Sequence, residues 1–323
     1  MADKGRVLTD KKLEEMERHL SAIYSRAHKE ISEKYENYIL KFEAADEKKR
    51  KLLDNGKITK KQYEHWRKGQ IATGAHWRNM KEQTAKQLLR VNQIAVAYIN
   101  DKLPEIYSIN YNWSAKNLEN QINNAISFEL VDAQTVKDLS LAGDKSFLPY
   151  KKLDPAKDIP WNMQNINAEV LQGILQGESI PKIAKRIQNV ENINKVSAIR
   201  TARTAVTTVE NQARQETAEK LVEMGTIVKK VWLSVGDKRT RSWHLAASRD
   251  YSESKAIPVD EPFIVGGEKM MRPGDTSLGA SGMNTYNCRC SSKNIVVGFK
   301  STLPPELRGK YKVKFNGKTI TNN

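Results

Sequence analysis

Apolar residues recur at steps of three and four over most of the first 140 positions. Between residues 10 and 42 they fill one stripe, while polar residues occupy the other faces. This period predicts a long amphipathic helix, and such a stripe either packs on another helix or binds a partner protein. The positions of the stripe are Leu13, Met16, Leu20, Ile23, Ala27, Ile31, Tyr35, Tyr38 and Phe42.

More helical patterns follow this stripe. The segment DNGK at 54–57 predicts a turn, and Thr59 is placed to cap a second helix. A third helical pattern runs from about 76 to 101, and a short helix or two is expected within 114–140. We therefore expect residues 1–142 to form a helical region.

The helical period is lost in the segment GDKSFLPYKKLDPAKDIPWNM at 143–163. Glycine and proline interrupt this stretch repeatedly, and both residues break regular structure. We interpret residues 143–168 as a linker. The interrupting residues are Gly143, Pro149, Pro155 and Pro160.

Helical periodicity returns after the expected linker. It covers about 165–176, breaks at Gly177 and restarts at Ser179, a residue type that caps helices. A long helix is then expected from about 195 to 223, with Gly225 at the position where a glycine commonly ends a helix.

The character of the chain changes after residue 226. The segment TIVKKVWLSV at 226–235 is rich in β-branched residues and predicts a strand. Residues 258–290 are rich in glycine and proline, with short candidate strands at 262–265 and 293–299. The expected fold is α+β, with a mostly helical N-terminal half and then a long helix packed on a small, irregular β-rich C-terminal unit.

The net charge of the chain indicates a class of binding partner. The 323 residues carry a formal charge of +16, which favours polyanions and nucleic acid first, although a solvated lysine-rich surface explains the same excess. The tail at 301–323 is itself basic. Its candidate phosphate contacts are Lys310, Lys312 and Lys314.

Membrane and secreted classes are not favoured. No run of 18 apolar residues exists, and the charged N-terminus lacks the apolar core of a secretory signal. The two cysteines, Cys288 and Cys290, are too close together to join distant parts of the chain, which fits a reducing cytoplasm.

Four motifs occur in order within the C-terminal half. They are EVLQGILQGESIPKIAKRI at 169–187, IRTARTAVTTVENQARQETAEKLVEMG at 199–225, VWLSVGDKRTRSWH at 231–244 and YNCRC at 286–290. The ordered set resembles the phage Mu F-like head-morphogenesis family of minor head proteins. Two departures concern polar positions: Ala205 stands where the family usually has an acid, and the Asp-Gly pair that often follows the histidine is missing.

The resemblance implies a role in virion assembly and no enzymatic activity. Residues 169–300 would be the Mu F-like head-morphogenesis domain, and the helical residues 1–142 would contact the portal. The implied partners are the portal protein and double-stranded DNA, with scaffold or major capsid protein as further candidates. Such a protein is expected in the head interior of a tailed DNA bacteriophage, and in the host cytoplasm during assembly.

Three arginines of the expected long helix are candidate contacts for nucleic acid or an acidic partner. Arg200 and Arg203 lie three residues apart and share a helix face, and Arg214 lies further along. Guanidinium groups bind phosphate through paired hydrogen bonds. The competing interpretation makes them structural ion pairs to the β-rich unit, because the apolar stripe of this helix indicates that it is half buried.

A polar cluster follows the strand at 226–235. Asp237 is expected to accept hydrogen bonds from Arg239 and Arg241 and so to fix the turn, with His244 close by. The alternative is an enzyme, such as a metal-dependent nuclease, that uses His244 as base or ligand together with the cysteines.

The cysteines define a candidate zinc site. Cys288 and Cys290 would share one face of an extended segment and reach a metal together with His244, with Asp237 or Asp275 completing four ligands. The competing interpretation is two small buried residues in a compact loop.

Overall fold

A computed structural model describes most of the chain, and it resolves into two compact units. Unit 1 comprises residues 1–17, 98–150 and 200–323, and unit 2 comprises residues 18–97 and 151–199. The described residues are 3–70, 75–122, 128–141, 153–176, 178, 180–300, 312–315 and 318–321.

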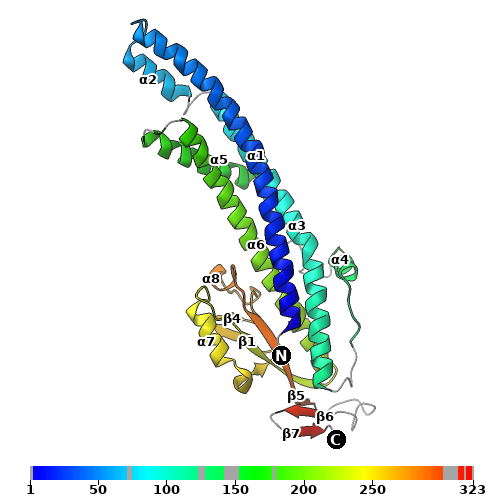
Figure 1. Cartoon of the computed structure of the whole chain (residues 1–323). Helices are drawn as coiled ribbons and strands as arrows, with labels where there is room; N and C mark the ends of the chain where they lie inside the picture. Colours follow the sequence, from blue (N-terminus) through cyan, green and yellow to red (C-terminus); the bar gives the residue numbers. More distant parts are fainter. Residues whose placement is uncertain are drawn as a thin grey trace. The chain divides into compact units, whose positions relative to one another are not determined.

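Helices dominate the first 223 residues, as the sequence predicts (Figure 1). They are α1 (Lys4–Asp54), α2 (Lys60–Lys68), α3 (Ala75–Gln121), α4 (Ala133–Leu141), α5 (Pro155–Leu175) and α6 (Ile180–Glu223). No helix in the described part of the chain is long and apolar enough to cross a membrane.

Helix α1 extends past both ends of its apolar stripe. Charged pairs one turn apart support its polar C-terminal end, such as Lys51 with Glu47 at 2.8 Å and Arg50 with Asp46 at 3.2 Å. The predicted cap of α2 is confirmed: the Thr59 hydroxyl accepts from the Gln62 backbone, and the Gln62 side chain accepts from the Thr59 backbone.

Two predicted interruptions are absent from the structure. Helix α3 continues through Pro104 to Gln121, because the buried residues Leu103, Ile106 and Tyr107 carry its apolar face past the proline. Helix α6 is continuous from Ile180, so the predicted restart near residue 195 is wrong. The proposed cap Ser179 lies outside the described residues.

The linker predicted at 143–168 is wrong for its C-terminal part. Residues 155–168 belong to α5, while 142–152 lie outside the described residues. Asp154 precedes the helix and its carboxylate accepts from the Ala156 backbone at 3.0 Å. Pro155 occupies the first helical position, where a missing N–H costs nothing, so this proline starts a helix and does not interrupt one.

Unit 2 buries the second half of the α1 stripe. Ile31, Tyr35, Tyr38 and Phe42 are at most 8% exposed. They pack with apolar residues of α3, α5 and α6, which confirms the interpretation that this stripe packs on other helices. The other members of this core are Met80, Ala85, Leu88, Ile166, Val170, Ile183, Ile187 and Val190.

Unit 1 contains the β-structure. Strand β1 (Thr226–Leu233) pairs antiparallel with both β2 (Ile257–Pro258) and β5 (Ser291–Phe299) (Figure 1). Smaller elements follow β1 and lie between the strands or after them. They are α7 (Ser242–Asp250), η2 (Glu253–Lys255), the hairpin β3 (Phe263–Val265) and β4 (Glu268–Met270), α8 (Gly282–Thr285), and the hairpin β6 (Lys312–Phe315) and β7 (Lys318–Thr321).

The long helices pack on this sheet through one apolar cluster. Leu118 of α3 and Leu221 of α6 meet Val228 of β1 and Val296 of β5, all at most 2% exposed. This packing confirms the predicted α+β class, with a long helix against a small β-rich unit.

The predicted end of α6 at Gly225 is confirmed. Gly225 has φ +91, a left-handed conformation that side chains disfavour by about 1–2 kcal/mol. Its N–H donates to the Val222 carbonyl at 3.1 Å, and its own carbonyl accepts from Lys300 at 2.8 Å. The turn therefore fixes where β1 begins relative to the helix.

We expect Gly225→Ala to lower the free energy of unfolding by about 1–2 kcal/mol, because the added Cβ opposes the left-handed turn. The matched control is Gly298→Ala in β5, where a Cβ would meet Ile227 at an ordinary 3.8 Å. Alanine in a strand is favoured over glycine, so that control should be neutral or stabilising by up to about 1 kcal/mol. Urea unfolding followed by circular dichroism measures the free energy of unfolding of both variants. Equal changes would contradict the role of Gly225 in the left-handed turn.

Candidate metal centre

His244, Cys288 and Cys290 meet in the interior of unit 1. His244 comes from α7, and the cysteines come from the segment that precedes β5. The His244 Nδ1 atom lies 3.3 Å from the Cys290 sulfur and 3.7 Å from the Cys288 sulfur. All three side chains are at most 2% exposed, and their ligand atoms all lie within 4.8 Å of one another.

A hydrogen-bond chain fixes the histidine ring. The Asn284 Oδ1 atom lies 3.1 Å from His244 Nε2 and accepts from the Trp243 indole N–H at 2.6 Å. The Asn284 amide nitrogen donates to the Val265 carbonyl and to the Glu268 carboxylate. These donors and acceptors leave only one orientation of the amide, with its oxygen toward the histidine.

The cysteine loop is held from behind by the polar face of α6. The Thr207 hydroxyl donates to the Cys288 carbonyl at 2.6 Å, and the Asn211 amide donates to the Cys290 carbonyl at 3.1 Å. The Thr204 hydroxyl accepts from the backbone N–H of Asn287, which has φ +55. With its backbone held in this way, the loop turns both sulfurs toward His244.

The residue between the cysteines points elsewhere. Arg289 forms a two-pronged ion pair with Asp237, with contacts of 2.7 and 2.6 Å. This arginine, followed by the hydroxyl of Thr240, holds the pKa of the Asp237 carboxyl well below its usual value. The pair ties the turn after β1 to the cysteine loop.

The predicted polar cluster is therefore rearranged. Asp237 does fix the turn, since it accepts from the Arg239 backbone and from Thr240, each at 3.0 Å. Its main guanidinium partner is Arg289. The exposed Arg239 side chain lies 3.7 Å from Asp237, and Arg241 donates to the Tyr286 carbonyl at 2.7 Å.

Neither proposed fourth ligand reaches the cluster. Asp237 is bound to Arg289, and Asp275 accepts from the backbone of Met271 and Ser277 at 2.9 and 3.1 Å. Among the described residues, the group of metal-binding side chains comprises the histidine and the two cysteines. A small pocket opens beside them, lined by Val235, Arg239, Thr240, Arg241, His244, Asn287, Cys288, Arg289 and Cys290.

The contact between the two thiols shifts their pKa values in opposite directions. Contact with the Cys290 thiol, and then with His244, places the pKa of Cys288 well below its ordinary value. The same contact with Cys288 and burial both raise the pKa of Cys290. The thiolate is the form of cysteine that binds metals.

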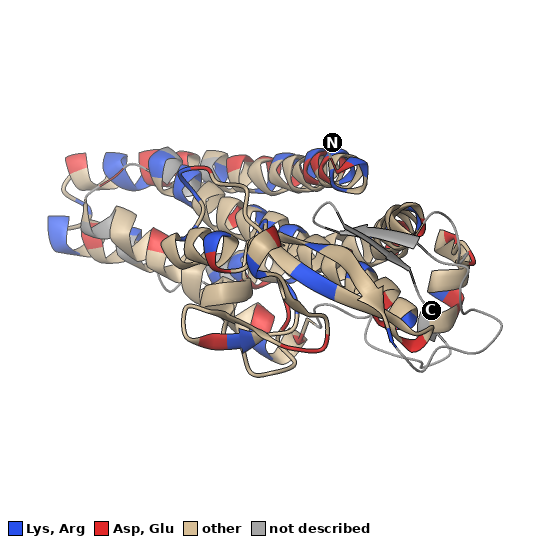
Figure 2. Ribbon diagram, turned by 90° about the horizontal axis from the view of Figure 1, so that it is seen from below, with Lys and Arg blue, Asp and Glu red and all other residues tan. Residues whose placement is uncertain are grey.

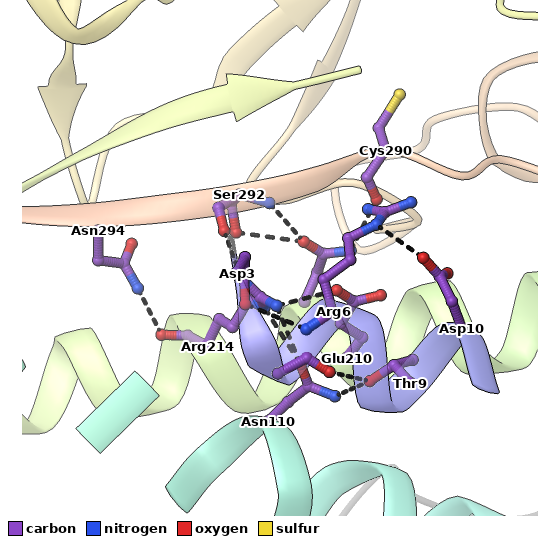
Figure 3. Close-up of polar contacts among 12 residues, drawn as sticks. Asp3, Arg6, Thr9, Asp10, Asn110, Glu210, Arg214, Cys290, Ser292 and Asn294 are labelled. Atoms are coloured by element: carbon purple, nitrogen blue, oxygen red, sulfur yellow. Dashed lines mark hydrogen bonds and ion pairs between the residues drawn. The ribbon is translucent and has the colours of Figure 1, made fainter. Parts of the chain in front are cut away.

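Arg214 occupies the centre of a buried polar network (Figure 3). Its guanidinium donates to Asn110 at 3.1 Å, to the Ser292 carbonyl at 3.1 Å and to Asp3, and it lies 3.1 Å from Glu210. Burial raises the pKa of the Glu210 carboxyl. Although burial alone would lower the pKa of Arg214, Glu210 and Asp3 raise it.

The nucleic-acid interpretation of Arg214 is therefore wrong, because all of its donors face inward. Arg203 also has an internal partner, since it forms a two-pronged pair with Glu17 of α1 at 2.5 and 2.9 Å. Arg200 is exposed. Lys310 lies outside the described residues, and of Lys312 and Lys314 only the backbone in β6 is described.

Several residues of the site were not predicted from the sequence. Thr204, Thr207 and Asn211 recur at helical steps in the 199–225 motif, so a polar stripe on α6 was the available signal. Asn284 gave no signal, because its role depends on the place of α8 beside α7.

Comparison with known proteins agrees with this architecture. Residues 164–293 match the model of the family described as phage Mu protein F like protein. The predicted family is confirmed for this region, which is Mu F-like. The match supports a phage head protein family.

A curated relative is the NAD(+)–arginine ADP-ribosyltransferase EFV of Enterococcus faecalis. It is 28% identical over 191 residues, which cover 59% of this chain. The chain spans about a third (36%) of the length of that relative. No solved structure matches the chain.

We expect Arg214→Met to lower the free energy of unfolding by about 3–5 kcal/mol, because it leaves the Glu210 carboxyl buried without its cation. The double variant Arg214→Met/Glu210→Leu should recover much of that loss. The control Arg203→Met removes a partly exposed pair and should cost about 1 kcal/mol or less. Urea unfolding tests this order, and equal losses for the two single variants would contradict it.

Proposed function

We propose that this protein is a minor head protein of a tailed DNA bacteriophage that takes part in head morphogenesis. The observation that carries the proposal is the Mu F-like match over residues 164–293. The buried packing of this region against the long helices supports a structural role. We place the protein in the head interior of the virion, with the host cytoplasm as its site before assembly.

A groove on unit 2 is the proposed portal-contact surface. Helices α1 and α3 line it with Ile23, Val91 and Ile94, and Ile94 is 56% exposed. Its rim carries the cations Arg26, Lys34, Lys86 and Arg90 beside a single acid, Glu30. Val91 is buried and Ile23 is half-buried, so Ile94 is the exposed apolar residue of the groove. An exposed apolar residue within a charged rim is a feature of surfaces that bind another protein.

We expect Ile94→Glu to reduce co-purification with the portal protein at least tenfold and to lower the amount of protein in purified particles, because it replaces the exposed apolar residue of the groove with a charge. Mass spectrometry of particles and pull-down with portal protein measure this. The matched control is Leu171→Glu on α5, an equally exposed apolar residue (57%) that does not line the groove.

Unchanged helicity by circular dichroism shows that a variant is folded. Folded Ile94→Glu with normal portal association would contradict the assignment of the groove. Absence of the wild-type chain from purified particles would contradict the head-protein proposal itself.

Double-stranded DNA is the second proposed partner. The formal charge of +16 supports it. Figure 2 shows basic residues interspersed with acidic ones along the helices. Since Arg203 and Arg214 are engaged internally, the proposed contacts are Arg200 and the tail at 301–323.

We expect DNA binding without sequence preference whose affinity falls steeply with salt, because each neutralised phosphate releases counterions. Deleting residues 301–323, which carry five basic residues and one acid, should make the slope of log affinity against log salt shallower by about 0.9 for each phosphate that the tail neutralises. Gel-shift titration at several salt concentrations measures the slope. Affinity independent of salt would contradict the proposal.

The same reactions test the enzymatic alternative. A metal-dependent nuclease built on His244 and the cysteines would cleave the DNA when divalent metals are added. Asp237, the carboxylate that the sequence analysis grouped with His244, is committed to Arg289 and is poorly placed as a general base. We therefore propose no enzymatic activity, and we do not extend ADP-ribosyl transfer from a relative that the chain covers only over 36% of its length.

A further inference from the structure

We propose that His244, Cys288 and Cys290 bind one zinc ion, with a fourth position open to the small pocket beside them. The proposal is independent of the portal and DNA contacts above. It rests on the convergence of three buried ligand atoms from two separate segments of the chain.

The spacing of the ligand atoms fits a tetrahedral metal. Zinc bonds of about 2.3 Å to sulfur and about 2.1 Å to nitrogen place the ligand atoms of a tetrahedral site about 3.6 Å apart. The two nitrogen–sulfur distances, 3.3 and 3.7 Å, lie on either side of that value. Two thiolates and one imidazole are a donor set that favours zinc over harder cations.

The histidine presents its lone pair to the thiols. Asn284 Oδ1 already accepts from Trp243, and it lies 3.1 Å from His244 Nε2, so this ring nitrogen must be the one that carries the proton. In the neutral ring, Nδ1 is then an acceptor, directed at both sulfurs. In metal-bound histidines, the ring nitrogen that does not bind the metal usually donates to such a hydrogen-bond partner, which orients the ring.

The cysteines are preorganised by contacts that do not involve the metal. Thr207 and Asn211 hold the carbonyls of Cys288 and Cys290, and Arg289 is drawn away toward Asp237. Alternation along the segment therefore brings the two sulfurs to one side although only one residue separates them.

The charges also favour a divalent cation. Two thiolates bring two negative charges into a buried site, and zinc would neutralise them. Because Asp237 and Asp275 are bound elsewhere, the fourth ligand would be a water molecule in the small pocket.

The first test is metal content of the full chain, purified without chelator and with reducing agent. We expect about one zinc per chain by elemental analysis. Replacement by cobalt should produce the thiolate charge-transfer absorption of a tetrahedral site, and zinc should slow the reaction of both thiols with Ellman's reagent.

Variants then distinguish a metal site from buried thiols. Cys290→Ser should abolish the cobalt charge-transfer band or reduce it strongly. Asn284→Ala should keep one site but weaken zinc affinity 10–100-fold, because the ring loses the acceptor that orients it. The matched control is Trp243→Phe, which removes the other donor to the same oxygen but keeps the His244–Asn284 bond, and its zinc affinity should stay within a few fold of wild type.

Three results would overturn the proposal. They are a wild-type chain that takes up no zinc after incubation with excess ion, a cobalt form without thiolate absorption, and thiol reactivity that zinc leaves unchanged. These measurements use the wild-type protein, so they decide the question even where a variant fails to fold. Equal zinc affinity for Asn284→Ala and Trp243→Phe would overturn the assigned role of Asn284.

Discussion

The C-terminal domain depends on one polar face of helix α6. Thr204, Thr207, Asn211 and Arg214 lie along this face and bind the backbone of the segment from Asn287 to Ser292. Buried loop backbone must find hydrogen-bond partners, and Asn287 to Cys290 precede β5 and have no strand partner in the described sheet. The helix provides them, and so it determines where the cysteine loop and β5 lie.

The same face explains the buried charges. Arg214 satisfies the Ser292 carbonyl and the Asn110 side chain, and Asn294 donates back to the Arg214 carbonyl at 2.8 Å. Glu210 and Asp3 balance its charge within unit 1. Separating a buried cation from such partners is strongly destabilising. This favours one alignment of helix and strand over alternatives shifted by one turn.

The two units differ in what the described residues offer. The segments around β1, β5 and α7 share a buried core that includes both cysteines, and a metal bound there would link α7 to the cysteine loop. The helices of unit 2 have an apolar core and leave a groove between α1 and α3 in which Ile94 is exposed.

The sequence by itself determined those elements whose signal is local. The period of Ile31, Tyr35 and Tyr38 predicted the buried face of α1, Gly225 predicted the end of α6, and the run at 226–235 predicted β1, because each depends on local sterics and on burial of a repeating face. The ordered motifs also indicated the Mu F-like family, which the match over residues 164–293 confirms.

Only the tertiary structure decided what the polar residues do. Pro155 starts a helix because Asp154 caps it, which composition could not show. The partner of Asp237 is Arg289, 52 residues away, and Arg214 is buried between segments that lie 104 residues from it at Asn110 and 211 at Asp3. Apolar periodicity reports that a face is buried, but a hydrogen bond needs a partner at a defined distance and angle. That geometry exists only once the distant segments have come together.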